Sequence, residues 1–484
     1  MSKTKNLPES VDFTEKELIN QSTELTEDEK RIVKSYLRKV DIRILPIVIS
    51  IYIFSLIDRG NIGAALVFGL RATLGLTQSQ EANATSVFYI IYILLETPSN
   101  MILKKFRPHY WFALIGILWS TSCILLSIAK NATTFTLLRG LLGAFESGYA
   151  PGVIGYYNYW YTRSEIGLRI TLLFFAAPIS GIIGGPLASK LASANFGRFK
   201  PFQAIFLVEG SITLLLSITA FFVLIDYPDE AKFFTPEEQT LILRRLKNEQ
   251  GIASQTKVSF RQTFKILQDW KIWTFAIITL GLNNLPIVTG VFGPTIIKAM
   301  GYTGTQATNI SAIPSACGLV GLTLILYLIN KIEYWLLIFM FGSLTGVSYA
   351  IVAFATNNTL RLFFLCLAGF GGVAVIPVIL TWISANQGGV YKGLIASGIT
   401  ISAGSVCGIV TPRFFVAEYA PKFTNGHVFT LAVLGLAIGL SVFLGIYFRK
   451  ENKRRDNNFV DVSHLSEEEQ RNMYDKHPEF RYKP

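Results

Sequence analysis

Charged residues are scarce in this sequence. Lys, Arg, Asp and Glu together account for 16% of its 484 residues, whereas hydrophobic residues account for 51% and the mean hydropathy is +0.43. A chain of this length with so little charge is not a single soluble domain. The composition predicts an all-α protein that crosses a membrane many times.

Signals of an enzyme or a metal site are also missing from the sequence. The four cysteines, Cys123, Cys317, Cys366 and Cys407, lie in apolar stretches without metal-ligand spacing, so we expect them to be inert core residues. There is no nucleotide-binding loop or nucleophile elbow, and we expect neither an enzyme nor a bound cofactor or metal. The first 25 residues contain no apolar run, which argues against a cleavable signal peptide and predicts a disordered tail.

Twelve apolar stretches have about the ~20 residues that a helix needs to cross a ~30 Å hydrocarbon core. The longest polar interruption, 226–271, follows the sixth stretch and divides the chain into two halves of six, which implies an internal pseudo-repeat. The predicted spans are 42–65, 84–104, 109–129, 133–156, 168–189, 203–225, 272–297, 306–329, 335–355, 360–383, 393–416 and 427–448.

Basic residues beside the spans predict the orientation of the chain. Lys and Arg cluster before span 1, between spans 2 and 3 and after span 12, so both termini are expected in the cytoplasm. This bias accounts for most of the net charge of +12, which therefore requires no nucleic-acid partner. The predicted parts are a cytoplasmic N-terminal tail, an N-terminal bundle, a cytoplasmic central loop, a C-terminal bundle and a cytoplasmic C-terminal tail, at 1–41, 42–225, 226–271, 272–448 and 449–484.

Two soluble helices are predicted in the central loop. Thr235–Gly251 opens with an N-cap threonine and a proline and closes with basic residues and glycine. Ser259–Trp270 gathers its apolar residues on one face, which suits a helix lying on the membrane surface. We interpret the loop as a linker between the bundles, with a regulatory role as the alternative.

Charges inside the apolar spans are the most informative feature of the chain. Asp58 and Arg59 lie within span 1, at ~1.5 Å per residue roughly 22 Å from its cytoplasmic end. Each such charge costs at least ~2.5 kcal/mol, so it usually serves a substrate path, a proton relay or a buried partner. Span 4 adds Arg139 and Glu146 on one stripe of its helix, and span 2 adds Glu96 near mid-bilayer. We expect these five side chains to converge.

The sequence pattern favours a transport role more strongly for some of these charges than for others. For Asp58, Arg59 and Glu146 we favour a transport role over a structural network, because alternating access needs groups whose charge changes with the cargo. For Arg139, holding Glu146 or Asp58 in place is an equally good interpretation. Glu96 precedes a proline, so packing at a helix kink is its alternative role.

The second half of the chain offers neutral polar side chains in place of charges. Asn283 and Asn284 stand out because Pro286 and Gly290 follow them, which predicts a broken helix that exposes backbone to a cargo. We predict that the first half recognises charge and couples to protons, while the second half selects the cargo by shape and hydrogen bonds. Either amide alone is also compatible with an ordinary interhelical hydrogen bond.

An ordered set of motifs resembles one known family. The motifs are "DRGNIGAA" at 58–65, "FYIIYILLETPSN" at 88–100, "RGLLGAFESGYAPG" at 139–152, "VEG" at 208–210 and "FGPTIIKAMGYTGTQA" at 292–307. They resemble the fungal allantoate-permease group of anion:cation symporters in the major facilitator superfamily, over a region from about Lys39 to "HPEF" at 477–480. The chain departs from the family pattern at Gly60 and at "YKGLIASG" from Tyr391, which concerns the substrate more than the mechanism.

The resemblance implies a twelve-helix, two-bundle carrier that takes up a small organic anion, such as nicotinate, pantothenate, biotin or allantoate, together with protons. In related symporters the arginines serve the anion and the carboxylates serve the proton. We expect that a proton on a buried carboxylate releases Arg59 for the substrate. The predicted substrate-binding residues are Arg59, Arg139, Asn283 and Asn284, and the predicted proton-coupling residues are Asp58, Glu146 and Glu96.

Two other functions stay open at this point. A drug:proton antiporter of the same fold is compatible with "GIIGGP" at 181–186, which partly matches an antiporter motif but equally suits close helix packing. A transport-dead nutrient sensor is disfavoured by the short tails. We expect a monomer in the lipid bilayer of the plasma membrane, with an internal membrane such as the vacuole or endoplasmic reticulum as the alternative.

Overall fold

The structure, a computed structural model, consists of helices, and the residues it describes contain no strand. It describes residues 26–103, 106–194, 196–231, 233–250, 260–388, 390–458, 462, 470 and 473–484. Eleven helices in these ranges are long and apolar enough to cross a membrane. The disordered tail predicted over the first 25 residues and the predicted helix ends at Gly251 and Ser259 lie outside the described residues.

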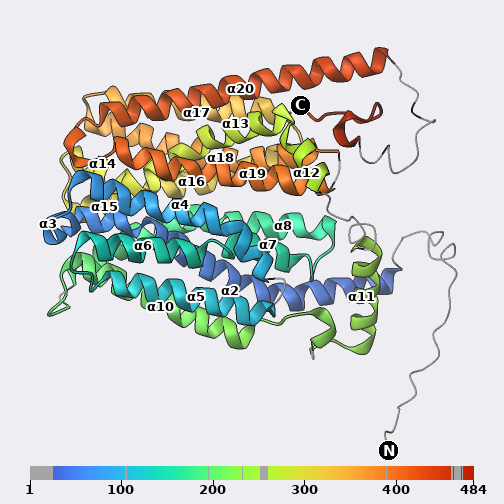
Figure 1. The fold of residues 1–484 in the computed structure, drawn as a ribbon, viewed down its shortest axis with the longest axis horizontal. Helices are drawn as coiled ribbons and strands as arrows, with labels where there is room; N and C mark the ends of the chain where they lie inside the picture. The colour runs from blue at the N-terminus through green and yellow to red at the C-terminus, as the bar shows by residue number, and fades with distance from the viewer. Residues whose placement is uncertain are drawn as a thin grey trace, which may run out of the picture.

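The first half of the chain folds into one bundle, drawn in blue and green in Figure 1. Its helices are α2 (Glu27–Val67), α3 (Leu70–Leu74), α4 (Gln78–Leu103), α5 (Pro108–Leu126), α6 (Ala132–Glu146), α7 (Tyr149–Tyr157), α8 (Arg163–Phe174), α9 (Ala176–Ser193) and α10 (Pro201–Val223). Helix α2 packs on α9 and α10, α4 packs on α6, and α5 packs on α6 and α10. These contacts bring the charged positions of α2 and α6 into one interior.

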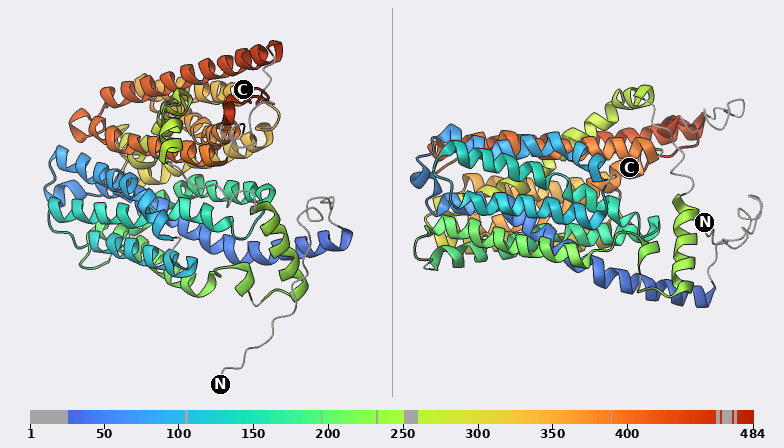
Figure 2. Two further views of the ribbon diagram at one scale, coloured as in Figure 1. Left: turned by 45° about the vertical axis from the view of Figure 1, so that its right-hand side comes forward. Right: turned by 60° about the horizontal axis from the view of Figure 1, so that its bottom comes forward.

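The second half folds into a second bundle, drawn in yellow to red, which lies against the first (Figures 1 and 2). Its elements are α13 (Trp270–Ile287), η2 (Val288–Phe292), α14 (Gly293–Ala299), α15 (Gly304–Ile310), α16 (Ala312–Leu328), α17 (Tyr334–Phe354), α18 (Asn358–Ala385), α19 (Val390–Val410), η3 (Thr411–Phe414), η4 (Ala417–Tyr419) and α20 (Thr424–Asn457). The break expected after Asn284 is present, because η2 is a π-helical turn directly after α13.

The predicted fourth span, 133–156, is divided into two helices. Helix α6 has 15 residues and α7 has 9, so neither alone is long enough to cross a membrane. The division falls at Ser147 and Gly148, where a Cβ on Gly148 would lie 2.0 Å from the Ser99 hydroxyl oxygen. Together α6 and α7 occupy the predicted span and complete the twelve-helix arrangement of two six-helix bundles, which is confirmed.

Glycines allow the closest helix contacts. A Cβ on Gly143 of α6 would lie 2.4 Å from the carbonyl oxygen of Phe88 on α4, within the first bundle. Gly185, in the "GIIGGP" stretch of α9, approaches the carbonyl oxygen of Thr308 in α15 equally closely, at 2.2 Å from its Cβ position. Close packing is therefore what both glycine patterns provide in this structure.

The two bundles join at the end that carries α3, α14 and α15, on the left in Figure 1, which we call the closed end. Ser86 donates a hydrogen bond to the Ile409 carbonyl oxygen at 2.8 Å, and Lys298 donates one to the Val67 carbonyl oxygen at 3.0 Å. Gly63 of α2 meets the backbone of Val291 so closely that a Cβ would lie 1.8 Å from its oxygen. Backbone contact and hydrogen bonds together hold the two bundles against each other at this end.

The opposite end, which we call the terminal end, carries the start of α2, the end of α20 and the two helices of the central loop, α11 (Pro236–Gln250) and α12 (Phe260–Leu267). Helix α11 lies across α2 (Figure 2, right). Thr235 and Glu238 form the reciprocal cap expected at its start, and Lys39 of α2 lies 2.7 Å from a Glu238 oxygen. Burial favours a higher pKa for Glu238, but the hydrogen bond from Lys39 brings its pKa below the ordinary value. Glu238 is thus ionised at neutral pH.

The last residues of the chain pack against the terminal end of the second bundle. The Tyr482 ring stacks on the Phe448 ring of α20 with centroids 4.5 Å apart. The indole of Trp382 in α18 donates a hydrogen bond to the Lys483 carbonyl oxygen at 2.8 Å. Asp475 is fully buried and lies 3.0 Å from Lys271 of α13. The C-terminal segment, 473–484, is therefore an integral part of the second bundle.

Candidate functional site

A cavity of about 390 Å³ lies between the two bundles. Its walls come mainly from α2, α4 and α9 on one side and from α13, α16, α18 and α19 on the other. Its volume lies in the range of sites that bind small molecules. The polar side chains that line it are Tyr52, Arg59, Asn61, Tyr89, Tyr92, Glu96, Ser180, Glu209, Thr279, Asn283, Thr289, Ser311, Ser315 and Ser405.

Arg59 is the basic side chain of this wall, and Glu146 of α6 holds it from behind. The guanidinium donates to one Glu146 oxygen, Oε1, from Nη2 at 2.7 Å and from Nε at 3.2 Å. Ser55 donates to the same oxygen at 2.6 Å. The Arg59 side chain is 20% exposed, whereas that of Glu146 is 1% exposed. A molecule in the cavity can therefore reach the arginine but not its partner.

Two aromatic rings of α4 flank the Arg59 guanidinium. Its central carbon lies 4.8 Å from the centroid of the Tyr92 ring and 5.4 Å from that of Phe88. Such cation–π contacts stabilise a guanidinium and limit its rotation. Tyr89 and Tyr92 both line the cavity, since residues three apart lie on one face of a helix. The arginine is thus presented between flat aromatic surfaces.

Asp58 points away from Arg59, as expected of adjacent residues on a helix. Its Oδ2 accepts a hydrogen bond from Thr213 of α10 at 2.9 Å, and its Oδ1 lies 3.5 Å from the thiol of Cys123 on α5. The side-chain partners of Asp58 therefore come from spans 3 and 6, and not from the other charged residues of spans 2 and 4. No Lys, Arg or His in the described ranges lies within 4.0 Å of its carboxylate.

Arg139 contacts the backbone of α2 and does not line the cavity. Its Nη1 donates to the Asp58 carbonyl oxygen and its Nη2 to that of Arg59, both at 3.3 Å. Its guanidinium carbon lies 5.2 Å from the centroid of the Phe88 ring, and the side chain is fully buried. Arg139 therefore positions the segment of α2 that carries the other two charges.

Glu96 and Asn283 line the cavity, whereas Asn284 does not. A Glu96 oxygen accepts a hydrogen bond from Ser402 of α19 at 3.3 Å, which links the two bundles. Asn283 donates to the Gly404 carbonyl oxygen at 2.9 Å. Asn284 is buried behind the wall and accepts a hydrogen bond from Thr411 at 2.5 Å. Of the two neighbouring amides, only Asn283 is available to a molecule in the cavity.

Several residues that line the cavity were not predicted from the sequence. Glu209 was named only within the "VEG" family motif, although, like Glu96, it is a carboxylate in the middle of a span. Asn61 was hidden inside "DRGNIGAA", one turn after Asp58. Tyr52 gave no signal, because a tyrosine in a membrane helix is ordinary. In the described part of the chain, no group of three or more His, Cys, Asp and Glu side chains is placed to hold a metal ion.

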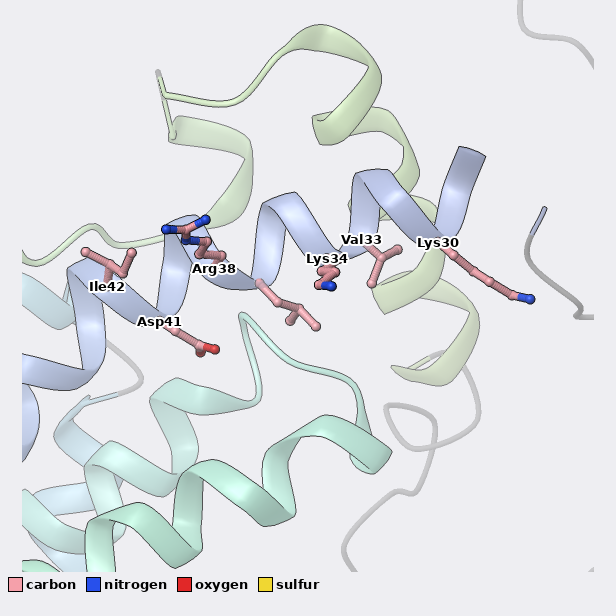
Figure 3. Close-up of a pocket in the computed structure, with 7 residues that line it drawn as sticks. Lys30, Val33, Lys34, Arg38, Asp41 and Ile42 are labelled. Atoms are coloured by element: carbon pink, nitrogen blue, oxygen red, sulfur yellow. The ribbon is translucent and has the colours of Figure 1, made fainter. Parts of the chain in front are cut away.

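A second hollow lies on the surface of α2 at the terminal end, far along the helix from Arg59 (Figure 3). Lys30, Lys34 and Arg38 line it together with apolar residues. Its one acidic residue, Asp41, points toward α8, where Arg169 pairs with it at 2.6 Å. This hollow belongs to the basic segment that precedes the first span and is separate from the cavity between the bundles.

Comparison with known proteins gives one family for the chain. The profile of the Major Facilitator Superfamily matches residues 48–412. The major facilitator-type transporter hxnP of Emericella nidulans is 27% identical over 460 residues, which cover 93% of each chain. The high-affinity nicotinic acid transporter of Saccharomyces cerevisiae is 28% identical over 457 residues, which cover 93% of this chain and 84% of the relative.

Solved structures of low sequence identity share the fold. A bacterial homologue of the human lysosomal transporter Spinster, in an inward-facing and occupied conformation, superimposes with a TM-score of 0.65 at 15% identity, over 84% of this chain and 96% of that one. A D-xylose–proton symporter superimposes with a TM-score of 0.64 at 12% identity, over 83% and 96%. With its two bundles, its central cavity and its matching profile, this chain belongs to the Major Facilitator Superfamily and is a multi-pass membrane transporter.

Proposed function

We propose that the protein takes up a small organic anion together with protons, as a member of the fungal allantoate-permease group. The observation that carries the proposal is Arg59, a cavity-lining guanidinium whose counter-charge, Glu146, is a protonatable group. The motifs "DRGNIGAA" and "RGLLGAFESGYAPG", which hold these two residues, support the family group. The name of the yeast relative, a nicotinic acid transporter, supports an acid as the substrate.

The coupling we propose depends on competition for Arg59. While Glu146 is ionised it occupies the guanidinium at 2.7 Å, and a substrate carboxylate would have to displace it. A proton on Glu146 removes the negative charge and leaves the arginine without a counter-ion, which favours binding of an anion. Binding of the proton and binding of the anion therefore assist each other.

Neutralisation also assists the conformational change. An anion that enters with its proton adds no net charge to the site, so the loaded carrier crosses the low-dielectric barrier more easily. With a potential of ~100 mV, negative inside, moving one elementary charge costs ~2.3 kcal/mol. An anion taken up without a proton would have to move against that field.

The remaining cavity residues set the shape of the site in this proposal. Tyr89 and Tyr92 offer flat surfaces beside the arginine, and Asn283 offers hydrogen bonds from the second bundle. Glu96, through Ser402, joins α4 to α19 and is placed to respond to movement between the bundles. A compact acid with a planar body suits this arrangement. Arg139 contributes by holding the α2 backbone, and we propose no direct contact between the substrate and Asn284.

We further propose that the terminal end is cytoplasmic, with both termini inside the cell and the chain in the plasma membrane as a monomer. The basic residues at the start of α2 and the end of α20 support this orientation. The tails, the two bundles and the central loop would then divide at 1–41, 42–225, 226–271, 272–448 and 449–484. Because the bundles are joined at the closed end, the structure would represent a conformation sealed toward the outside.

A drug:proton antiporter is the second candidate. A cationic drug would meet the positive charge of Arg59 on the cavity wall, which is unfavourable, and the "GIIGGP" stretch is accounted for by packing of α9 against α15. The direction of proton flux separates the two: in a symporter, addition of substrate draws protons in with it, and in an antiporter protons move the opposite way. A transport-dead sensor would show no flux of either kind.

The proposal is tested by uptake in cells that lack their own carriers. Competition among labelled nicotinate, pantothenate, biotin and allantoate, at pH 5 and pH 7, identifies the acid. We expect Arg59→Ala to reduce its uptake by more than tenfold, and Glu146→Gln to abolish accumulation while exchange of labelled for unlabelled substrate continues. Arg449→Ala, which removes an arginine from a surface pair with Glu333, is the matched control and should behave as wild type. Accumulation with normal pH dependence in both site variants would contradict the assignment.

A further inference from the structure

The cavity wall contains one buried carboxyl group that the proposed anion site does not use. Glu209 of α10 lines the cavity, yet the residue is only 1% exposed. Its Oε2 is buried and has no hydrogen-bond partner among the described residues. A buried carboxylate oxygen without a partner is costly, whereas the neutral acid carries a hydrogen that can be donated. The site therefore favours a proton on Glu209.

The surroundings of Glu209 contain a second acid but no base. Asp58 and Asn61 of α2 and Cys123 of α5 are the groups that interact with it. Helix α9, which also packs on α10, has Lys190 as its one charged side chain, and that lysine is exposed. Within the described ranges no Lys, Arg or His lies within 4.0 Å of either carboxyl group. Two ionised carboxylates side by side without a cation repel each other, so the pair favours at least one proton.

Asn61 connects the two acids. Its side-chain oxygen is buried and has no hydrogen-bond partner in the described chain, which matches the free Glu209 oxygen. Its amide nitrogen lies 3.5 Å from the Cys123 sulfur, and that sulfur lies 3.5 Å from Asp58 Oδ1. A protonated Glu209 would supply the hydrogen that the Asn61 oxygen lacks. Side chains thus link the cavity-lining acid to the fully buried one.

We propose that Glu209 is a residue through which a coupled proton, separate from the one on Glu146, enters and leaves, and that it shares this proton with Asp58. Only Glu209 reaches the cavity, because Asp58 is 0% exposed and does not line it. The Glu209 carboxylate accepts a proton from water in the cavity when the cavity faces outside and returns it to water when the cavity faces the terminal end. No covalent bond other than the O–H bond forms or breaks, and Glu209 carries one proton in each cycle. The inference rests on the proposed proton coupling.

The same arrangement explains how this proton affects the attraction of Arg59 for an anion. Asp58 precedes Arg59 directly, and Arg139 is bonded to the backbone carbonyl oxygens of both residues. A proton shared by Asp58 and Glu209 removes a negative charge close to the guanidinium. The arginine then attracts an external anion more strongly. Two protonatable sites, Glu146 in contact with Arg59 and the Asp58–Glu209 pair beside it, would act on the same cation.

The test uses purified full-length protein in proteoliposomes, with nicotinate as the probe. Three quantities are measured: exchange of labelled nicotinate, accumulation driven by a proton gradient, and proton uptake on addition of nicotinate. We expect Glu209→Gln to retain exchange within about threefold of wild type, and to lose accumulation and substrate-linked proton uptake by at least tenfold. The matched control is Glu81→Gln, which neutralises a buried carboxyl near Arg71 at the closed end, outside the cavity, and should resemble wild type in all three.

Other outcomes overturn the inference. If Glu209→Gln accumulates nicotinate with the pH profile of wild type, Glu209 is structural. If the variant fails to fold, wild-type protein is treated with dicyclohexylcarbodiimide, which modifies protonated carboxyls in apolar surroundings, and Glu209 is followed by peptide mass spectrometry. Modification that declines between pH 5 and pH 8 supports the proposal, while absent or pH-independent modification contradicts it.

Failure of the proposed function gives a different result. If wild-type protein and the Glu81→Gln control exchange nicotinate without any linked proton movement, the symport proposal itself is wrong. If wild-type protein exchanges neither nicotinate nor the other three acids, the substrate class is wrong. A defect confined to Glu209→Gln, with normal coupling in wild type, is specific to the residue.

Discussion

At the residue scale, the five charges predicted to converge do so, but with unequal access. Arg59 and Glu96 line the cavity, Glu146 supports Arg59 from behind, and Asp58 and Arg139 are fully buried. Their helical spacing made convergence predictable. Their partners were not predictable, because a pairing between helices depends on how each helix is rotated about its axis.

Arg139 gives a prediction about stability. Arg139→Lys keeps the positive charge but cannot reach two carbonyl oxygens with a planar fork. Each bond from a charged donor contributes about 1.5–3 kcal/mol, so we expect a clear fall in melting temperature together with reduced uptake. Thermal denaturation of the purified protein measures the first effect. Arg71→Lys, which changes a partly exposed arginine near Glu81, should have little effect, and equal melting temperatures for both variants would contradict the role of Arg139.

At the scale of elements, buried charges hold the C-terminal segment against the terminal end of the second bundle. Lys271 of α13 and Lys392 of α19 each contact both Asp269 and Asp475. Burial acts to raise the pKa of Asp269, but Lys271 and Lys392 bring it below its ordinary value. A carboxylate with a lowered pKa stabilises the fold at every pH above about 4, and this contribution is lost as pH falls through the lowered pKa. The cluster is therefore intact at physiological pH.

Removal of one charge from this cluster should release the C-terminal segment, 473–484, from the second bundle. Asp475→Asn leaves two buried lysines with one carboxylate, and breaking a buried ion pair costs about 3–5 kcal/mol. We expect a lower melting temperature and faster proteolysis of 473–484. The control is Asp456→Asn, which breaks an exposed pair with Arg481 and should cost about 0–1 kcal/mol. An Asp475→Asn protein as stable as the control would mean that the stacking of Tyr482 on Phe448 is sufficient to hold the segment.

At the scale of the whole molecule, the closed end determines which side of the membrane the cavity faces. It depends on backbone contact between α2 and η2 at Gly63 and on hydrogen bonds such as that of Lys298 to the Val67 carbonyl oxygen. Alternating access requires these contacts to separate while each bundle stays intact. The contact at Gly63, which only glycine permits, therefore influences the equilibrium between conformations that are joined and open at the closed end.

Gly63→Ala should move that equilibrium. The added Cβ would lie 1.8 Å from the Val291 oxygen, so the bundles cannot meet as they do here, and conformations open at the closed end should increase. The measurement is electron-spin distance between labels at the exposed residues Thr73 and Lys422, in a background where the four native cysteines are replaced. We expect the distribution to shift to longer distances. Gly439→Ala, where nothing lies within 4 Å of the added atom, should leave it unchanged, and an unshifted Gly63→Ala distribution would show that the contact does not limit opening.

Most of the fold could be predicted from the sequence, and the site only in part. The length of a span is set by the thickness of the hydrocarbon core, which is why eleven of the predicted spans coincide with helical stretches long and apolar enough to cross a membrane. The irregularity expected after Asn284 appears as η2. The division of the fourth span at Ser147 and Gly148 was not predicted, because the close approach of Gly148 to Ser99 of α4 depends on how the two helices pack. Asn284 was predicted to bind the substrate because it lies next to Asn283 in the sequence. Neighbouring side chains on a helix point ~100° apart, however, and only Asn283 lines the cavity.

The amino-acid sequence alone predicts a membrane protein of two bundles with costly charges in its interior, because the cost of a charge in hydrocarbon can be estimated from composition and spacing. The packing of the helices is needed to see which charges meet, which of them reach the cavity and at which end the bundles join. These depend on the rotation and close approach of helices far apart in the chain. Glu209 shows the difference most clearly. Its carboxylate is visible in the sequence, but its place near Asp58, with no Lys, Arg or His of the described ranges within 4.0 Å, is created by the packing of α10 on α2.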